Sequence, residues 1–433
     1  MPEAPAIAFV TLGCPKNEVD SDRMAAAVTA SSYRLVDDPA QADVVVLNTC
    51  SFIQAATEES IAEAFELAGA WKPLAKDRKL VVAGCMVSRY GADLAEAMPE
   101  ADAFLPVADE GSLSAVIERL TGVAAAAPAV ASAPPRMPPG HTAYLKVSEG
   151  CDRRCTYCAI PAIRGPFVSS PIDVLLAEAR FLVDNGAREI VLVGQDIASY
   201  GHDLPGGEDL ASLVEQLDRI DGDFRIRLMY LQPDGVTARL LGAITRASRV
   251  CHYLDIPLQH ASTSVLKAMG RTGSPETHLE LLQRVRLALP DVALRTTVIA
   301  GFPGETEEQA SELEAFLAEA RFDFVGVFAY SAEEGTSAAS LPGHLPDDVR
   351  QERAQRLREV ADAVGYELAA ARVGSVLRVL VEGEDEGETI GRTCGQAPEV
   401  DGMTVLEGTA PTGAFVDARI IDSVGYDLVG AVL

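Results

Sequence analysis

The 433-residue sequence has no run of about 18 apolar residues, so nothing in it has the pattern of a membrane-spanning helix. It also lacks a basic stretch followed by a long apolar one near its start, which is the pattern of a secretory leader. Positive charge is scarce, because 36 lysines and arginines stand against 64 aspartates and glutamates and leave a net charge of −28. We therefore expect a cytoplasmic protein without membrane contact, whose acidic surface repels nucleic-acid phosphates.

Eight cysteines remain to be explained in this chain. In a reducing cytosol, cysteines serve as metal ligands or redox groups more often than as disulfides. The length predicts two or three domains. A hydrophobic content of 48% with 23% charged residues is typical of a globular protein.

Three of the cysteines, Cys151, Cys155 and Cys158, lie in one loop with the spacing Cys-x3-Cys-x2-Cys. Three thiolates can hold three irons of a 4Fe–4S cluster, which leaves the fourth iron open. An open iron can chelate a substrate, and the amino and carboxylate groups of S-adenosylmethionine fit that vacancy. A zinc site or a disulfide is the alternative, but zinc sites usually take four ligands in paired form, and no fourth ligand lies nearby in the sequence.

Three further cysteines, Cys14, Cys50 and Cys85, are far apart in the sequence, but each follows a predicted strand. Helical segments predicted at about 20–30 and 55–70 separate these strands, and this alternation indicates a parallel α/β layer. The carboxyl ends of parallel strands share one edge of the sheet, so the three thiols should converge. We predict a second 4Fe–4S cluster with one open iron; three separate buried cysteines are the alternative. The apolar segments that precede the cysteines are 6–12, 43–47 and 79–83.

An Ala- and Pro-rich segment at 121–141 predicts an extended linker. It divides an N-terminal cluster domain, 1–120, from a central domain, 142–373, and a compact tail follows at 374–433. Six βα units in the central domain predict an open (β/α)6 partial barrel with its site at the carboxyl ends of the strands. An amphipathic helix at 346–373 leads to the tail. The central strands are predicted at 144–147, 189–193, 225–230, 252–256, 294–299 and 324–329.

The tail is predicted to be a small antiparallel β-barrel, because short alternating strands are separated by Gly and Asp clusters. These strands are expected at 377–382, 389–393, 403–406 and 414–423. The tail carries eleven acidic residues against three arginines, a net charge of −8. A barrel that tracks RNA would be basic, so this one should favour a positively charged protein surface. The alternative is that the tail is merely as acidic as the rest of the chain.

Polar residues follow several of the central strands and are candidates for contacts with a bound cofactor. We predict such contacts for Gln195, Gln259 and Arg295, and for Tyr157 within the cysteine loop. A loop residue without any ligand is the alternative for each of them.

The three parts together resemble the methylthiotransferases of the radical S-adenosylmethionine superfamily, which combine a three-cysteine N-terminal domain, a radical core and a C-terminal TRAM barrel. Several motifs are similar to the RimO branch of that family. The tRNA-modifying branch usually has Gly-Cys-Gln-Met-Asn where this chain has Gly-Cys-Pro-Lys-Asn. The similar motifs are Gly-Cys-Pro-Lys-Asn at 13–17, Cys-Ala-Ile-Pro at 158–161, Pro-Leu-Gln-His-Ala-Ser at 257–262 and Ala-Pro-Glu-Val-Asp-Gly at 397–402.

The resemblance implies an enzyme that adds a methylthio group to the β-carbon of an aspartate in ribosomal protein S-twelve of the small subunit, a basic protein. It implies two 4Fe–4S clusters, two molecules of S-adenosylmethionine per turnover and a reduced flavodoxin or ferredoxin-type electron donor. In that family the cluster of the Cys-x3-Cys-x2-Cys loop cleaves S-adenosylmethionine to a 5′-deoxyadenosyl radical, which abstracts hydrogen. The cluster of the N-terminal cysteines carries the sulfur. All six cysteines would thus be catalytic as well as metal ligands.

Three other functions remain open at this point. A tRNA adenosine methylthiotransferase would form a tight, salt-dependent complex with tRNA, which the acidic tail argues against. A two-cluster electron carrier would use four cysteines for each cluster. An iron or redox sensor with a protein-binding tail would form no deoxyadenosine.

Overall fold

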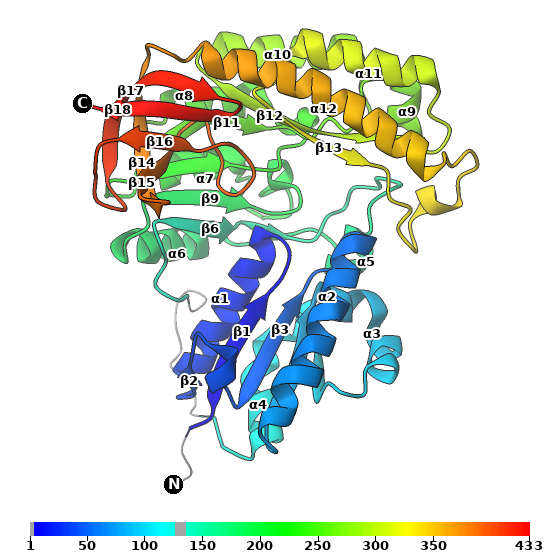
Figure 1. Ribbon diagram of the computed structural model, residues 1–433, viewed down its shortest axis with the longest axis vertical. Coiled ribbons are helices and arrows are strands. Elements are labelled where there is room, and N and C mark those ends of the chain that lie inside the picture. Colours follow the sequence, from blue (N-terminus) through cyan, green and yellow to red (C-terminus); the bar gives the residue numbers. More distant parts are fainter. Residues whose placement is uncertain (1–3, 126–135) are drawn as a thin grey trace.

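The computed structural model describes residues 4–125 and 136–433. A smaller lobe built from the first part of the chain lies below a larger lobe that holds the rest (Figure 1). No helix within the described ranges is long and apolar enough to cross a membrane. The predicted α/β class with a C-terminal β-barrel is confirmed.

The smaller lobe is a five-stranded parallel sheet in the order β2-β1-β3-β4-β5. Its central strands are fully buried, because helices α1 and α4 cover one face and α2 and α3 cover the other. A strand buried on both faces needs apolar residues throughout, which explains the run of valines before Asn48. The elements are β1 (Ala6–Thr11), α1 (Pro15–Ala30), β2 (Arg34–Leu35), β3 (Val44–Thr49), α2 (Gln54–Glu66), β4 (Lys79–Gly84), α3 (Cys85–Ala97), β5 (Ala103–Pro106) and α4 (Leu113–Thr121).

Two helices of this lobe differ from the prediction. Helix α1 was expected from residue 20, but it begins at Pro15 directly after Cys14, because proline is well suited to the first turn of a helix. Helix α2 was expected to reach residue 70, but it ends at Glu66 and continues as a π-helical turn, Leu67–Trp71. The early start of α1 places its first turn beside the cysteine at the end of β1.

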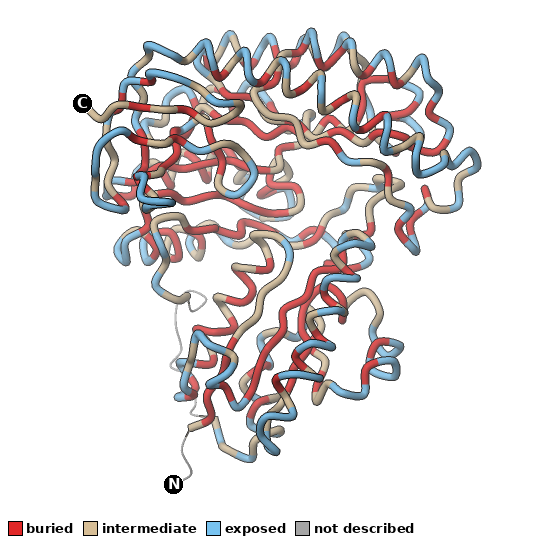
Figure 2. Tube along the Cα trace, in the orientation of Figure 1, coloured by how far each residue is buried: buried red, intermediate tan, exposed pale blue. Residues whose placement is uncertain are grey.

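The larger lobe contains an open parallel sheet in the order β13-β12-β11-β10-β9-β6, which confirms the predicted six-stranded partial barrel. Helices cover its outer side, and the strands form the buried centre in Figure 2. The strands are β6 (Thr142–Lys146), β9 (Glu189–Val193), β10 (Arg225–Leu228), β11 (Val250–Asp255), β12 (Ala293–Ala300) and β13 (Phe324–Ala329). The helices are α6 (Ile172–Asp184), α7 (Leu210–Leu217), α8 (Ala238–Arg246), α9 (Thr263–Ala268), α10 (Pro275–Ala288), α11 (Glu307–Ala320) and α12 (Asp347–Ala370).

A short hairpin that the sequence did not predict flanks the Cys-x3-Cys-x2-Cys loop. It pairs β7 (Ser148–Glu149) with β8 (Val168–Ser169), and helix α5 (Ile160–Arg164) lies between them. The hairpin closes the loop at its base, so the three cysteines project from a fixed frame.

The tail forms a closed barrel of five strands in the order β14-β15-β16-β18-β17. It differs from the prediction in two respects: a fifth strand, β18, was not expected, and β16 and β18 pair in parallel, so the barrel is not wholly antiparallel. Closure removes the exposed strand edges that a four-stranded sheet would leave. The strands are β14 (Val376–Asp385), β15 (Glu388–Thr393), β16 (Thr404–Glu407), β17 (Phe415–Val424) and β18 (Asp427–Val432).

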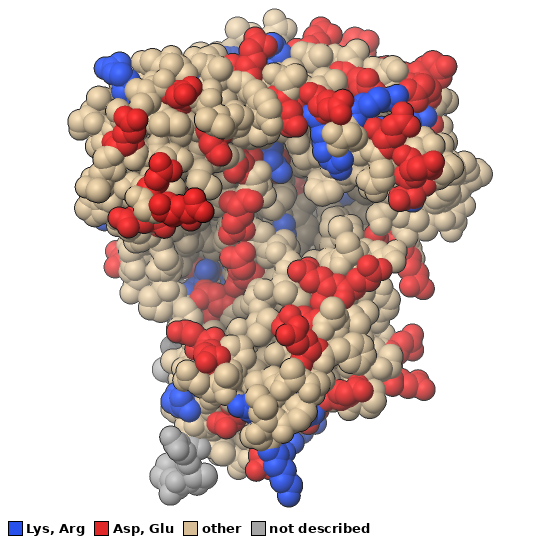
Figure 3. Space-filling view, viewed as in Figure 1, with Lys and Arg blue, Asp and Glu red and all other residues tan. Residues whose placement is uncertain are grey.

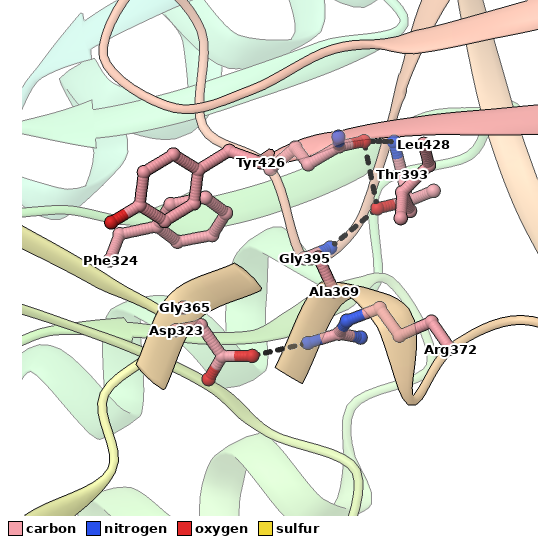
Figure 4. A pocket seen from close by; sticks show the side chains of 10 residues that line it. Asp323, Phe324, Gly365, Ala369, Arg372, Thr393, Gly395, Tyr426 and Leu428 are labelled. Atoms are coloured by element: carbon pink, nitrogen blue, oxygen red, sulfur yellow. Dashed lines mark hydrogen bonds and ion pairs between the residues drawn. The ribbon is translucent and has the colours of Figure 1, made fainter. Parts of the chain in front are cut away.

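The barrel docks against the larger lobe through side chains at the end of α12 and on β13. In Figure 4 the ring of Tyr426 lies over Phe324, with ring centroids 5.4 Å apart, and Arg372 pairs with Asp323. Deeper in the junction, Glu189 on β9 accepts bonds from Arg392 of the tail and from two arginines of β10. These contacts fix the tail against the amino-terminal ends of β9, β10 and β13.

Candidate functional site

The cysteines of the smaller lobe meet at one edge of its sheet, as predicted. Cys14 and Cys50 follow β1 and β3, and Cys85 opens α3 directly after β4. Gly13 has a φ of +98°, and a β-carbon on it would lie 2.5 Å from the β-carbon of Cys50 and 2.9 Å from its sulfur. The glycine before Cys14 therefore permits both a left-handed backbone and the approach of the second thiol.

Gly84, before Cys85, also has a positive φ and no room for a side chain. Its φ is +91°, and an added β-carbon would lie 2.2 Å from the Asn48 side-chain oxygen. Burial raises the pKa of the Cys85 thiol to about 12, and the thiolates of Cys14 and Cys50 act in the same direction. A positive centre bound beside Cys85 would favour the thiolate form of this residue.

The Cys-x3-Cys-x2-Cys loop is held by backbone bonds at both ends. The Cys151 N–H donates to the Gly165 carbonyl at 3.2 Å, and the Cys158 N–H donates to the Cys155 carbonyl at 3.1 Å. Burial, together with the other two thiolates, raises the pKa of Cys158 to about 12. All three cysteines of the loop are free and partly exposed, so their thiols face an accessible space.

The two cysteine groups are candidate ligand sets for iron–sulfur clusters. Within residues 4–125 and 136–433, no group of three or more histidine, cysteine, aspartate or glutamate side chains is arranged to hold one metal ion. In a 4Fe–4S cluster each cysteine binds a different iron, so the sulfurs lie farther apart.

A buried charged network connects the two cysteine groups. The Arg164 guanidinium, on α5 after the cysteine loop, donates to the Cys85 sulfur at 3.2 Å and to Asn17 Oδ1 at 2.5 Å. It also pairs with Asp20 at 2.7 Å, and Asp20 in turn pairs with Lys146. Arg164 therefore follows the loop of Cys151, Cys155 and Cys158 in the chain and contacts Cys85, a candidate ligand in the other cysteine group.

Glu149, at the base of the cysteine loop, closes this network. It pairs with Lys146 at 2.6 Å and with Arg164 at 3.2 Å. Despite burial, these two cations hold the pKa of the Glu149 carboxyl below its usual range. The network therefore keeps its carboxylates ionised and fixes the orientation of both lobes at the site.

The four residues that were predicted to contact a cofactor have different surroundings in the structure. The Gln195 amide donates to Glu149 at 2.9 Å, Gln259 has a φ of +73° beside β12, and Tyr157 packs beside Phe302. Arg295 is engaged by the tail, since its guanidinium pairs with Asp401 Oδ1 at 3.0 Å. An Arg295 contact with a cofactor would therefore compete with this ion pair.

The motif at 397–402 brings the tail into the site. Asp401 accepts a bond from the Tyr253 hydroxyl at 2.8 Å, and Glu399 accepts one from the Tyr144 hydroxyl at 3.0 Å. Glu399 and burial together raise the pKa of Glu18, on α1, to about 7. This loop of the tail therefore lies close both to α1 of the smaller lobe and to strands β6 and β11 of the larger lobe.

No separate role was predicted for Lys16, Arg164, Asp20 or Lys146, because charged residues in strands and helices are usually exposed. Two signals were available: Lys16 belongs to the motif at 13–17, and Lys16 and Arg164 lie two and six residues beyond cysteines of the site. The space-filling view shows a hollow between the lobes with acidic side chains along its rim (Figure 3). An acidic rim favours a positively charged partner.

Comparison with known proteins agrees with these features. Residues 145–317 match the radical SAM superfamily, 373–433 match the TRAM domain, and 6–106 match the uncharacterized protein family UPF0004. The fold is similar to that of the radical S-adenosylmethionine methyltransferase TsrM from Kitasatospora setae, with a TM-score of 0.56, 15% identity and coverage of 75% of this chain and 73% of that one. The cobalamin-dependent radical enzyme OxsB gives a TM-score of 0.54 at 14% identity, covering 83% of this chain and 56% of that one. The chain is thus a radical SAM protein.

Its sequence relatives define the family more narrowly. The chain is 41% identical to the ribosomal protein uS12 methylthiotransferase RimO of Geobacter sulfurreducens, over 99% of this chain and 98% of the relative. It is 44% identical to RimO of Anaeromyxobacter sp. strain K, over 98% of this chain and 92% of the relative. The chain belongs to the RimO family of methylthiotransferases.

Proposed function

We propose that this chain transfers a methylthio group to the β-carbon of an aspartate in ribosomal protein uS12. The observation that carries the proposal is the similarity to relatives of that name over nearly the whole chain, including both cysteine groups. The acidic tail supports it, because a basic ribosomal protein is the kind of partner that a net charge of −8 attracts. A tRNA substrate is disfavoured on the same grounds.

Two 4Fe–4S clusters are part of the proposal, one held by Cys151, Cys155 and Cys158 and the other held by the remaining triad. When bound, they supply the electron that cleaves S-adenosylmethionine and a Lewis-acidic site for the transferred sulfur. Two molecules of S-adenosylmethionine are consumed per turnover, and a reduced flavodoxin or ferredoxin-type protein provides electrons. The residues of the other triad are Cys14, Cys50 and Cys85.

The residues of the chain hold and orient these groups. Arg164 donates to the Cys85 sulfur, and this cation stabilises negative charge on the thiolate. The network of Asp20, Lys146 and Glu149 holds Arg164 in place between the triads. Gln195, Gln259, Arg295 and Tyr157 are the proposed contacts of S-adenosylmethionine.

The three functional parts correspond to residues 1–120, 142–373 and 374–433, joined by the segment 121–141. The middle of that segment, 126–135, lies outside the described residues. The protein would act in the cytoplasm, on uS12 either free or within the small ribosomal subunit.

Mass spectrometry of an anaerobic reaction tests this function. The reaction contains the reconstituted protein, dithionite, sulfide, S-adenosylmethionine and a peptide from the aspartate loop of uS12. We expect the peptide to gain one methylthio group while deoxyadenosine forms, and an Asn-for-Asp peptide to stay unmodified. Deoxyadenosine with an unmodified aspartate peptide, and methylthiolation of added tRNA instead, would show that the substrate assignment is wrong.

A further inference from the structure

Lys16 reaches from the smaller lobe to the mouth of the partial barrel. It is the second residue of α1, two positions after Cys14, and its ammonium nitrogen lies 3.7 Å from the centre of the Tyr230 ring. Tyr230 follows β10 and has a φ of +64°, and its N–H donates to Asp255 at 3.0 Å. The ammonium group is therefore held where the two lobes face one another.

This ammonium group has no carboxylate partner in the part of the chain that the structure describes. No carboxylate oxygen of residues 4–125 or 136–433 lies within 4.0 Å of the Lys16 ammonium nitrogen. By contrast, Lys146 is paired with both Asp20 and Glu149. The carboxylate of Asp255 acts on Lys16 only from beyond that distance.

A partly buried cation without a carboxylate partner is unusual, because partial burial weakens its hydration. The Cys14 thiolate, two residues away, is a negative group that acts on Lys16. Lys16 is only partly exposed. The aromatic face of Tyr230 stabilises the cation on one side. The N–H groups on its other sides remain available to an anion that enters the space between the lobes.

We propose that Lys16 binds the side-chain carboxylate of the substrate aspartate. This inference rests on the proposed function and names the residue that recognises its substrate. The β-carbon of aspartate is bonded directly to the carboxylate carbon, so a fixed carboxylate also fixes the reacting carbon. Lys16 would then select aspartate over asparagine and place the β-carbon near the two cysteine groups, as near-attack geometry requires.

A binding experiment with two peptides tests the proposal. Fluorescence anisotropy measures the Kd of the aspartate peptide and of its isosteric asparagine variant, with the cluster-loaded protein and no reductant, so that no turnover occurs. A charge-assisted bond should give the unmodified protein a preference for aspartate of about 10- to 100-fold. Lys16→Met removes the charge with little change of volume and should bind both peptides with nearly equal affinity.

The ratio of the two Kd values within one protein cancels any general loss of folding or peptide affinity. Lys16→Arg keeps the positive charge and should retain most of the preference, while iron content and circular dichroism report on the integrity of each variant. If Lys16→Met keeps the full preference of the unmodified protein for the aspartate peptide, the inference is wrong. Lys16 would then serve only to balance the negative charge near Cys14, and the proposed function would stand. If the unmodified protein binds neither peptide, the substrate assignment fails together with the inference.

Discussion

Replacing Glu189 by glutamine should weaken the docking of the tail barrel severely. The Glu189 carboxylate is fully buried and lies 2.8 Å from Arg225, 2.6 Å from Arg227 and 2.7 Å from Arg392 of the tail. These three arginines hold the pKa of Glu189 far below its usual range. The neutral amide removes the one charge that all three share, and its NH2 group points at a guanidinium.

The expected cost follows from the burial of these charges. Removing one partner of a buried ion pair costs about 3–5 kcal/mol, because the remaining charge is left without compensation. For a domain of this size that loss corresponds to a Tm lower by roughly 10 °C. Arg225 and Arg227 also donate to backbone carbonyls of the tail, to Arg392 O and Cys394 O. If these two arginines lose their fixed positions, the tail should also be held less firmly.

The assay combines thermal unfolding with limited proteolysis of the tail. Glu215→Gln is the matched control, because Glu215 also pairs with two arginines, at 2.7 Å and 2.9 Å, but on the surface. Exposed pairs contribute little, so this control should leave the Tm nearly unchanged. The reasoning is refuted if Glu189→Gln and the control have the same Tm and the same rate of tail cleavage.

Three further predictions concern the site. Arg164→Met removes the donor to Cys85 and should lower the reduction potential of the cluster held by Cys14, Cys50 and Cys85 by about 50 mV, or ~1 kcal/mol for one electron. An EPR-monitored redox titration measures this potential, and an unchanged value would contradict the prediction. Glu18 has a folded pKa of about 7, above its unfolded value, so its contribution to stability is complete at low pH and is lost as the pH rises through 7. Chemical unfolding at a series of pH values should show this loss, of about 2 kcal/mol, and a Glu18→Gln variant should not. Gly150→Ala places a β-carbon 2.1 Å from a backbone oxygen and should reduce bound iron sharply. Gly165→Ala has open space at its β-carbon but a backbone conformation that favours glycine, with φ +75° and ψ −166°, so it should cost about 1–3 kcal/mol of strain and reduce bound iron less; equal iron contents would count against this reading.

The parts of the fold that are built from continuous apolar segments were predictable from the sequence. Most apolar strands of the two parallel sheets are buried on two faces, so their hydrophobic runs located them to within a few residues, although β5 was not predicted. Strands β2 and β7 were missed because two-residue strands carry no periodic signal. Strand β18 was missed because Gly430 interrupts its pattern, although that glycine lies against Ala418 in the closed barrel.

The site was only partly predictable. The cysteines could be placed because each follows a strand, and strand ends share an edge. The partners of Arg164 could not be predicted, because Asp20, Glu149 and Cys85 come together only when the two lobes dock. Arg295 was expected to face a cofactor, yet its pairing with Asp401 depends on where the tail barrel lies, which no local pattern specifies.

Counting iron and products in cysteine variants tests the central claim, that two separate cysteine groups hold two clusters with different tasks. The unmodified protein should bind about eight irons, and a variant with Cys14, Cys50 and Cys85 replaced by alanine should bind about four. That variant should still form deoxyadenosine from S-adenosylmethionine but leave the uS12 peptide without a methylthio group. If it retains all of its iron, or still modifies the peptide, these three cysteines do not hold a second cluster and the account is contradicted.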